Sequence, residues 1–294
     1  MIWVVPTLIA AAAQTARNAM QAGLTRSIGT LGATQVRFVF GLPFAVIFLL
    51  AVVLVTGQPV PRMGAGALGF TIIGATAQIA ATALMLWAMS RRSFAVATAW
   101  IKTEPVMVAI FGVIALGDHL SMMQTAAILI ATLGVVLISA RDGLASMLSD
   151  SRPALAGIAA GALFGASAVG FRGAILGLDG GDQLIRATTT LVWALAMQTL
   201  MLGGWLLVFR RQALIGGFRE WRASLPAGFM GALASQFWFL GFALTSAANV
   251  RTLALVEVIF AQIVSRRIFR QHIARRELAG MALIIVGVIV LVRS

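Results

Sequence analysis

EPVMVAIFGVIALGDHL, at residues 104–120, returns 153 residues later as EVIFAQIVSRRIFRQHI at residues 257–273. This alignment places Glu104 on Glu257, each inside a long apolar stretch, and it also superimposes the only two histidines of the chain. The apolar segments that follow the two copies match at a shared glycine. The chain therefore contains a weak internal duplication.

The composition is that of an integral membrane protein. Sixty per cent of the residues are hydrophobic and 11 per cent are charged, whereas an ordinary soluble domain carries about 25 per cent charged residues. A membrane-spanning helix needs about 20 mostly apolar residues, and the apolar segments are too continuous for the alternating strands of a barrel. We therefore predict an all-α polytopic protein with ten transmembrane helices, at residues 2–23, 32–56, 65–89, 94–116, 121–140, 154–176, 184–209, 224–245, 248–268 and 276–293.

The duplication divides these ten spans into two repeats of five. We predict a first repeat at residues 1–142, a polar cytoplasmic linker at 143–152 and a second repeat at 153–294. Because each repeat crosses the membrane an odd number of times, the second must lie inverted relative to the first. Inverted repeats that meet near the middle of the membrane are typical of secondary transporters.

Arginine distribution predicts the orientation. The odd-numbered connections between spans hold 14 arginines, whereas the even-numbered connections and the two ends hold about four. Positive charges concentrate on the cytoplasmic side of membrane proteins, so we expect both termini to be extracytoplasmic. The net charge of +13 is explained by this scatter of single charges, and we expect no nucleic-acid partner.

Enzyme chemistry has no support in the sequence. The chain has no cysteine, which excludes thiolate nucleophiles and thiolate metal ligands. It also has no GxSxG, HExxH or P-loop motif, and His119 and His272 each lie beside a predicted turn. We therefore expect neither catalysis, nor a cofactor, nor a metal site.

Ionisable side chains inside the spans form a second group of candidates. Lys102, Glu104 and Glu257 lie well inside predicted spans, where each uncompensated charge costs a few kcal/mol. Lys102 cannot face Glu104, since two residues correspond to about 200° of helical rotation, so any partner must come from another helix. Two interpretations stay open for the carboxylates: coupling to a proton or a substrate amine, or a structural ion pair. Arg17 and Arg37 lie near the ends of their spans, where an extended side chain can reach the interface.

Uncharged polar and aromatic residues inside the spans predict a cavity. Gln14 and Asn18 are four residues apart and share one helical face. Amides and aromatic rings in a membrane-embedded cleft can bind a zwitterion, although helix–helix hydrogen bonding and core packing explain each residue singly. The predicted substrate-binding set is Gln14, Asn18, Gln78, Trp100, Phe164, Ser167, Gln236 and Trp238.

The fourth and fifth spans carry a familiar pattern, namely a mid-helix Pro105, the turn Gly117-Asp118-His119-Leu120, and an apolar helix containing Gly134. This pattern resembles the EamA-type repeat of the drug/metabolite transporter superfamily, and the chain is most similar to its YddG-type amino acid exporters. The second copy departs from the pattern, because Val258 replaces the proline. The resemblance implies a central cavity between the repeats, lined by spans 1, 3, 4, 6, 8 and 9 and braced from outside by spans 5 and 10.

These observations favour a multi-pass, monomeric transporter of the bacterial inner membrane. Its expected partners are membrane lipid and a small-molecule substrate, an aromatic or neutral amino acid or a similar metabolite, which it exports by alternating access. The alternatives are a proton-coupled efflux pump for cationic drugs, which would use Glu104 or Glu257, and a membrane scaffold without transport.

Overall fold

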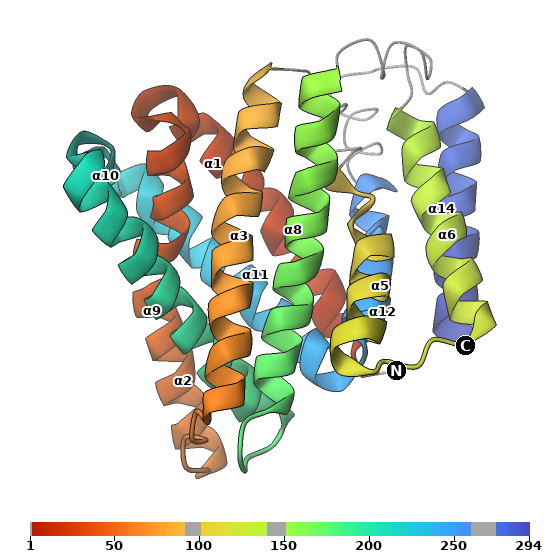
Figure 1. Ribbon diagram of the computed structural model, residues 1–294, viewed down its shortest axis with the longest axis horizontal. Helices are drawn as coiled ribbons and strands as arrows, with labels where there is room; N and C mark the ends of the chain where they lie inside the picture. Colours follow the sequence, from red (N-terminus) through yellow and green to blue (C-terminus); the bar gives the residue numbers. More distant parts are fainter. Residues whose placement is uncertain (1, 92–100, 140–150, 260–274) are drawn as a thin grey trace.

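A computed structural model describes residues 2–91, 101–139, 151–259 and 275–294 of the chain (Figure 1). Within this part of the chain every regular element is a helix. The helices are α1 (Val4–Val39), α2 (Leu42–Thr56), α3 (Ala65–Arg91), α5 (Glu104–Leu116), α6 (Met122–Ser139), α8 (Ser151–Leu176), α9 (Gln183–Phe209), α10 (Arg211–Arg219), α11 (Trp221–Leu244), α12 (Ala247–Leu253) and α14 (Arg275–Arg293).

The helices correspond to the predicted spans. Each predicted span contains a described helix, although the fourth and ninth are described only in part and the predicted linker lies mostly outside the described residues. α1 and α2 form one apolar helical stretch of 53 residues, long enough for two crossings. Gly29, with φ of 73°, interrupts α1, because a positive φ is readily adopted only by glycine. The first crossing therefore ends at this kink and the second continues through α2.

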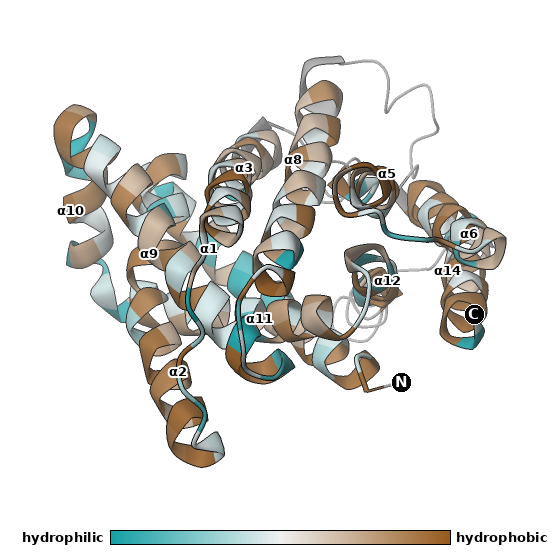
Figure 2. Ribbon diagram, turned by 60° about the horizontal axis from the view of Figure 1, so that its bottom comes forward, coloured by the Kyte–Doolittle hydropathy of each residue, from teal (hydrophilic) through white to brown (hydrophobic). Residues whose placement is uncertain are grey.

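Large apolar side chains cover the outer surface. Leu54 and Val55 on α2, Leu200 and Val208 on α9, and Leu133 on α6 are all strongly exposed. Figure 2 shows α2 as hydrophobic along almost its whole length. Such a surface is compatible with lipid and not with water. Together with the helix lengths it identifies a polytopic membrane protein.

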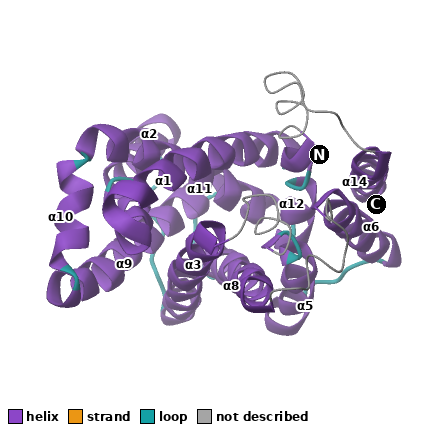
Figure 3. Ribbon diagram, turned by 90° about the horizontal axis from the view of Figure 1, so that it is seen from above, coloured by secondary structure: helices purple, strands orange, loops and turns teal. Residues whose placement is uncertain are grey.

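Helices from the two repeats pair in a symmetrical manner. α3 packs along α8, α1 packs along α11, and α6 packs along α14 (Figures 1 and 3). α3 is the third span of its repeat and α8 is the first span of the other, while α1 and α11 show the converse pairing. The fifth spans, α6 and α14, pack on each other. A pseudo-twofold axis between inverted repeats produces this arrangement.

Glycines set the closest of these contacts. Gly134 on α6 lies against Gly280 on α14, whereas Ala127, earlier on α6, lies against Gly287, later on α14. The two helices therefore run antiparallel, as the inverted arrangement requires. A Cβ atom added to Gly134 would lie 2.6 Å from the carbonyl oxygen of Gly280, so only a glycine permits this backbone approach.

The pairing of α3 with α8 follows the same rule. A Cβ atom on Gly170 would meet the backbone of Gly74 at 2.9 Å, and one on Gly173 would meet Phe70 at 2.7 Å. Gly161 lies equally close to the carbonyl oxygen of Ile101, just before α5. Small residues at these positions let α8 approach two helices of the first repeat.

Asp182 joins the repeats at one edge of the bundle. Its carboxylate caps α9 by accepting bonds from the amides of Leu184 and Ile185, and it accepts a 2.8 Å bond from Gln58 in the first repeat. The backbone bond from Ile185, followed by the bond from Gln58, lowers the pKa of Asp182 below its usual value. Figure 1 places both chain termini at one edge of the bundle, and their cellular side stays a prediction.

We expect Gly134→Ala to lower the thermal stability of the purified protein, by about 1–3 kcal/mol in the free energy of unfolding, because the methyl group overpacks the crossing of α6 and α14. The measurement is the midpoint of thermal unfolding in detergent, followed by size-exclusion fluorescence. Gly204→Ala is the matched control, since a Cβ atom there meets nothing within 4 Å. Equal midpoints for the two variants would contradict the assigned close contact.

Asp182→Ala should cost about 0.5–2 kcal/mol of stability through loss of the helix cap, whereas Asp182→Asn should cost less because asparagine also caps helices. The lowered folded pKa means that the charge of Asp182 stabilises the fold above the unfolded pKa of about 3.9. That contribution disappears as the pH falls through the folded pKa. The difference in midpoint between wild type and Asp182→Asn should therefore be constant from pH 5 to pH 7 and shrink below about pH 4.

Candidate transport site

Two spans are interrupted at equivalent positions of the repeats. In the fourth span the helix is broken at residues 102–103 and α5 begins at Glu104; in the ninth, α12 ends at Leu253 and helical backbone resumes at residue 256. Pro105 occupies the first turn of α5, a position where its missing N–H costs nothing. Broken helices inside a membrane expose backbone groups and mark binding sites in transporters.

Crossed ion pairs connect these two breaks. Lys102 of the first repeat pairs with Glu257 of the second, and Arg251 of the second repeat contacts Glu104 of the first, with Nε 3.0 Å from Oε1. All four side chains are almost buried. Lys102 thus finds its carboxylate on another helix, as helical geometry requires. The contacts themselves are present in the structure, while the role of the two carboxylates, in coupling or as structural charges, stays a prediction.

Arg251 is held by aromatic rings as well as by a carboxylate. Its guanidinium lies 4.4 Å from the ring centroid of Trp238 and 5.4 Å from that of Phe242, a favourable cation–π arrangement. The indole Nε1 of Trp238 donates a 3.0 Å hydrogen bond to Gln14. Two predicted site residues, Gln14 and Trp238, are therefore part of one network that reaches Glu104.

Arg17 and Arg37 extend the charged network and correct one sequence interpretation. Each is only 2% exposed, so neither side chain extends to the surface of the protein. Arg17 donates a 2.7 Å hydrogen bond to Asn18, whereas the hydrogen bonds of Arg37 to Thr82 and Ser235 are both long, at 3.4 Å. The guanidinium carbon of Arg37 also lies 5.6 Å from the ring centroid of Phe38. The snorkelling interpretation of Arg37 is wrong because α11 packs directly over this part of α1.

The remaining predicted residues lie elsewhere in the bundle. Gln78 accepts a 2.9 Å bond from Gln198, and Gln236 donates a 2.8 Å bond to Thr188. Both partners lie on α9, so these amides make helix–helix hydrogen bonds. Phe164 and Ser167 are buried on α8, and the Ser167 hydroxyl has no hydrogen-bond partner within the described ranges. Trp100 lies outside the described residues.

Three charged members of the network escaped sequence reasoning as site residues: Arg17, Arg37 and Arg251. Arg251 stands only three residues after the predicted start of its span at residue 248, so the sequence alone groups it with the arginines of the even-numbered connections. One available signal is its position six residues before Glu257 within an otherwise apolar segment. Gly29 kinks α1 ahead of Arg37, and the side-chain amide of Gln21 donates to the carbonyl oxygen of Ala33 across this kink.

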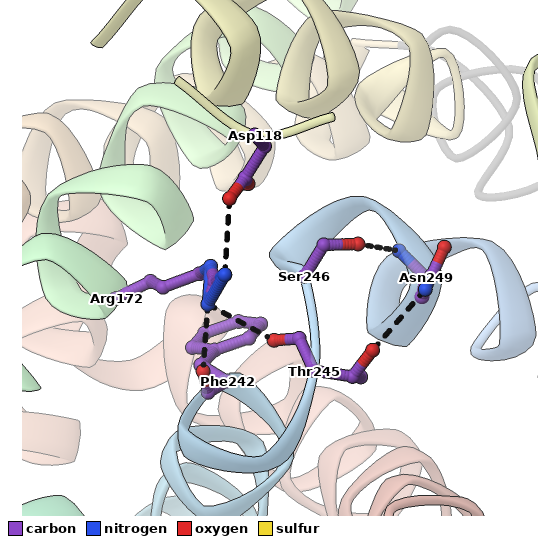
Figure 4. A network of polar contacts seen from close by, with 6 residues as sticks. All are labelled: Asp118, Arg172, Phe242, Thr245, Ser246 and Asn249. Atoms are coloured by element: carbon purple, nitrogen blue, oxygen red, sulfur yellow. Dashed lines mark hydrogen bonds and ion pairs between the residues drawn. The ribbon is translucent and has the colours of Figure 1, made fainter. Parts of the chain in front are cut away.

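A separate polar cluster ties three segments together at the edge of the bundle (Figure 4). Arg172 on α8 donates to Asp118 at 3.0 Å and to the carbonyl oxygens of Phe242 and Thr245 at 3.3 and 3.2 Å. The carboxylate belongs to the first repeat and the carbonyls to the second. This cluster therefore links the loop after α5 to the loop between α11 and α12.

A cavity lies at the opposite edge of the bundle. The short helix α10 borders a cavity of about 730 Å³, which lies away from the crossed ion pairs and includes none of the predicted substrate-binding residues. Its lining combines basic and apolar groups: Ser27, Ile28, Phe209, Arg210, Arg211, Gln212, Ala213, Gly216, Arg219 and Glu220.

Comparison with known proteins identifies the family. The model of the EamA-like transporter family matches residues 1–140 and again residues 151–293. The chain belongs to the EamA-like transporter family. Its coarse function is therefore that of a membrane transporter of small molecules, which agrees with the absence of enzyme motifs.

The comparison with solved structures supports the fold and nothing further. No curated protein matches the chain. A solved crystal structure described only as that of a protein is similar over 98% of this chain and 95% of its own, with a TM-score of 0.72 and 14% sequence identity. At this identity the likeness supports the architecture and carries no information on substrate.

We expect Asp118→Asn to destabilise the protein by about 1–3 kcal/mol, because it leaves the guanidinium of Arg172 without its carboxylate in a largely buried place. The midpoint of thermal unfolding measures the loss. Asp179→Asn is the matched control, since Asp179 is exposed and its side chain is not part of this cluster. A loss of equal size in both variants would show that the ion pair contributes nothing specific.

Proposed function

We propose that this EamA-family protein is a secondary transporter that exports amino acids or similar small metabolites across the bacterial inner membrane by alternating access. The observation that carries the proposal is the coincidence of three features in one place. The contact between the inverted repeats, the breaks in two spans and the crossed ion pairs all meet there.

Alternating access requires the two repeats to separate first on one side and then on the other. The ion pair between Lys102 and Glu257, and the contact between Arg251 and Glu104, both cross this interface. Interactions of this kind can hold an occluded state and exchange partners as the repeats move. The helix breaks beside them supply hinges that change backbone angles without unfolding a whole span.

The network favours a zwitterion over a simple cation. Both carboxylates near the breaks are already neutralised by Lys102 and Arg251, so a cationic drug would have to displace a protein cation. An amino acid instead offers a carboxylate and an ammonium group, which a mixed array of cations and carboxylates can bind. Trp238 and Gln14 add an aromatic face and an amide next to the charges.

Reconstituted protein should move labelled neutral amino acids into liposomes without a pH gradient. Trp238→Phe should lower this flux about two- to tenfold, because it removes the hydrogen bond to Gln14, which is worth about 0.5–1.5 kcal/mol, and keeps the ring. Trp193→Phe is the matched control, since Trp193 on α9 is 42% exposed and faces outward.

Three outcomes discriminate among the functions. Normal flux in Trp238→Phe would remove Trp238 from the site while leaving transport intact. Movement of cations that requires a proton gradient and vanishes in Glu104→Gln would favour drug efflux. No flux for any member of a broad amino-acid panel would contradict the amino-acid proposal.

A further inference from the structure

The charges around the helix breaks do not balance. Among the described residues this network contains four cations, Arg17, Arg37, Lys102 and Arg251, but only two carboxylates, and each carboxylate already has a cation. Arg17 and Arg37 are thus left without a carboxylate partner in the part of the chain that the structure describes. Two buried positive charges remain to be compensated.

These two arginines lie side by side. A Cβ atom placed on Gly231 of α11 would lie 3.3 Å from Cγ of Arg37 and 3.5 Å from Cδ of Arg17. The two side chains are therefore separated by no more than about 7 Å at these atoms. A Cβ atom at this position would be tight against Arg37 and in ordinary van der Waals contact with Arg17, so Gly231 gives space chiefly to Arg37.

Some N–H donors of the two guanidinium groups have no hydrogen-bond acceptor among the described residues. Nε and Nη1 of Arg17 and Nε of Arg37 are buried and have no hydrogen-bond partner among the described residues. The hydrogen bonds that Arg37 does make, at 3.4 Å, lie at the long limit for such a bond. Each unpaired charge in a membrane interior costs several kcal/mol, and glutamine or methionine would avoid that cost.

We propose that Arg17 and Arg37 form the recognition site for an oxyanion of the transported metabolite, its carboxylate or phosphate. The proposal rests on the proposed transport function and names the substrate class: small organic anions and zwitterions rather than cations. The planar guanidinium presents paired N–H donors that match two oxygens of a carboxylate or phosphate. Bound at this place, the anion would neutralise one of the surplus charges and fill the unused donors.

The position of the pair also explains how binding could bias the transport cycle. Arg251 stacks on Trp238, and Trp238 donates to Gln14, which lies one turn before Arg17 on α1, so the positive charges of these arginines repel one another. A bound anion weakens this repulsion and so changes the balance of charge around the contact between Arg251 and Glu104. The anion site and the crossed ion pairs thus belong to one electrostatic unit, in which Arg17 and Arg37 have no carboxylate partner among the described residues.

The test measures binding by thermal stabilisation of the full-length protein in detergent. The probes are L-phenylalanine, its amide, 3-phenylpropionate and inorganic phosphate. We expect the two carboxylates to stabilise the wild type and the amide, which lacks the carboxylate, to have no effect. Stabilisation by phosphate as well would extend the substrate class to phosphate esters.

The variants are Arg17→Gln and Arg37→Gln, with Arg219→Gln as control because Arg219 is exposed on α10. Each site variant should lose at least tenfold in affinity for the carboxylates, while the control keeps wild-type affinity. In the absence of probe, Arg17→Gln should melt at or above the wild-type midpoint, since it removes an uncompensated buried charge. A purely structural arginine would instead give a lower midpoint and unchanged affinity for the folded fraction.

Failure of this inference is distinguishable from failure of the transport proposal. Wild-type protein that moves amino acids and their amides equally well, with Arg17→Gln unchanged, retains its function and overturns the anion site. No stabilisation by L-phenylalanine, 3-phenylpropionate or phosphate also overturns it. Arginine-dependent stabilisation without amino-acid flux supports the site and rejects the amino-acid proposal.

Discussion

Charge neutralisation inside the membrane is the constraint on which the contact between the two repeats depends. Glu104 and Glu257 stand at equivalent positions of the duplication, and neither could remain ionised and unpaired among apolar helices. Each is matched by a cation of the opposite repeat. The repeats therefore meet where their charges are, and the helix breaks lie at the same level. The contact between the repeats, the helix breaks and the polar site therefore all follow from the need to neutralise these two carboxylates.

The symmetry of the carboxylates does not extend to their partners. The position equivalent to Lys102 is Leu255, and the residue equivalent to Arg251 is a threonine. Lysine is a compact charge on a flexible stem, whereas Arg251 is fixed by stacking on Trp238. The two bridges consequently differ in strength and rigidity. The free energy needed to open one side of the protein therefore need not equal the free energy needed to open the other. Such a difference between the repeats favours one direction of transport.

The sequence predicted features that depend on periodicity and missed those that depend on which helices meet. Hydropathy located the ten spans, and an odd number of spans per repeat implied the inversion. Helical rotation alone was enough to separate Lys102 from Glu104. By contrast, Gln78 and Gln236 turned toward α9, and an isolated polar residue in an apolar helix does not reveal its direction. The burial of Arg37 depended on α11, which lies almost 200 residues away in the chain.

Selection for stability alone does not account for the surplus positive charge. Neutral side chains in place of Arg17 and Arg37 would remove the free-energy cost of desolvating two charges and would leave no carboxylate unpaired. Substitutions that do not lower stability are readily found at positions that function does not constrain. Gly231 on the facing helix lies beside both arginines, and a Cβ atom there would be tight against Arg37. The desolvation cost of the two arginines and the glycine that lies beside them are found at the same place, the interface between the repeats that transport must open. A buried positive charge that is unfavourable in the protein without substrate becomes favourable when an anion binds. This difference in free energy between the free and the bound protein lets a substrate change the conformational equilibrium.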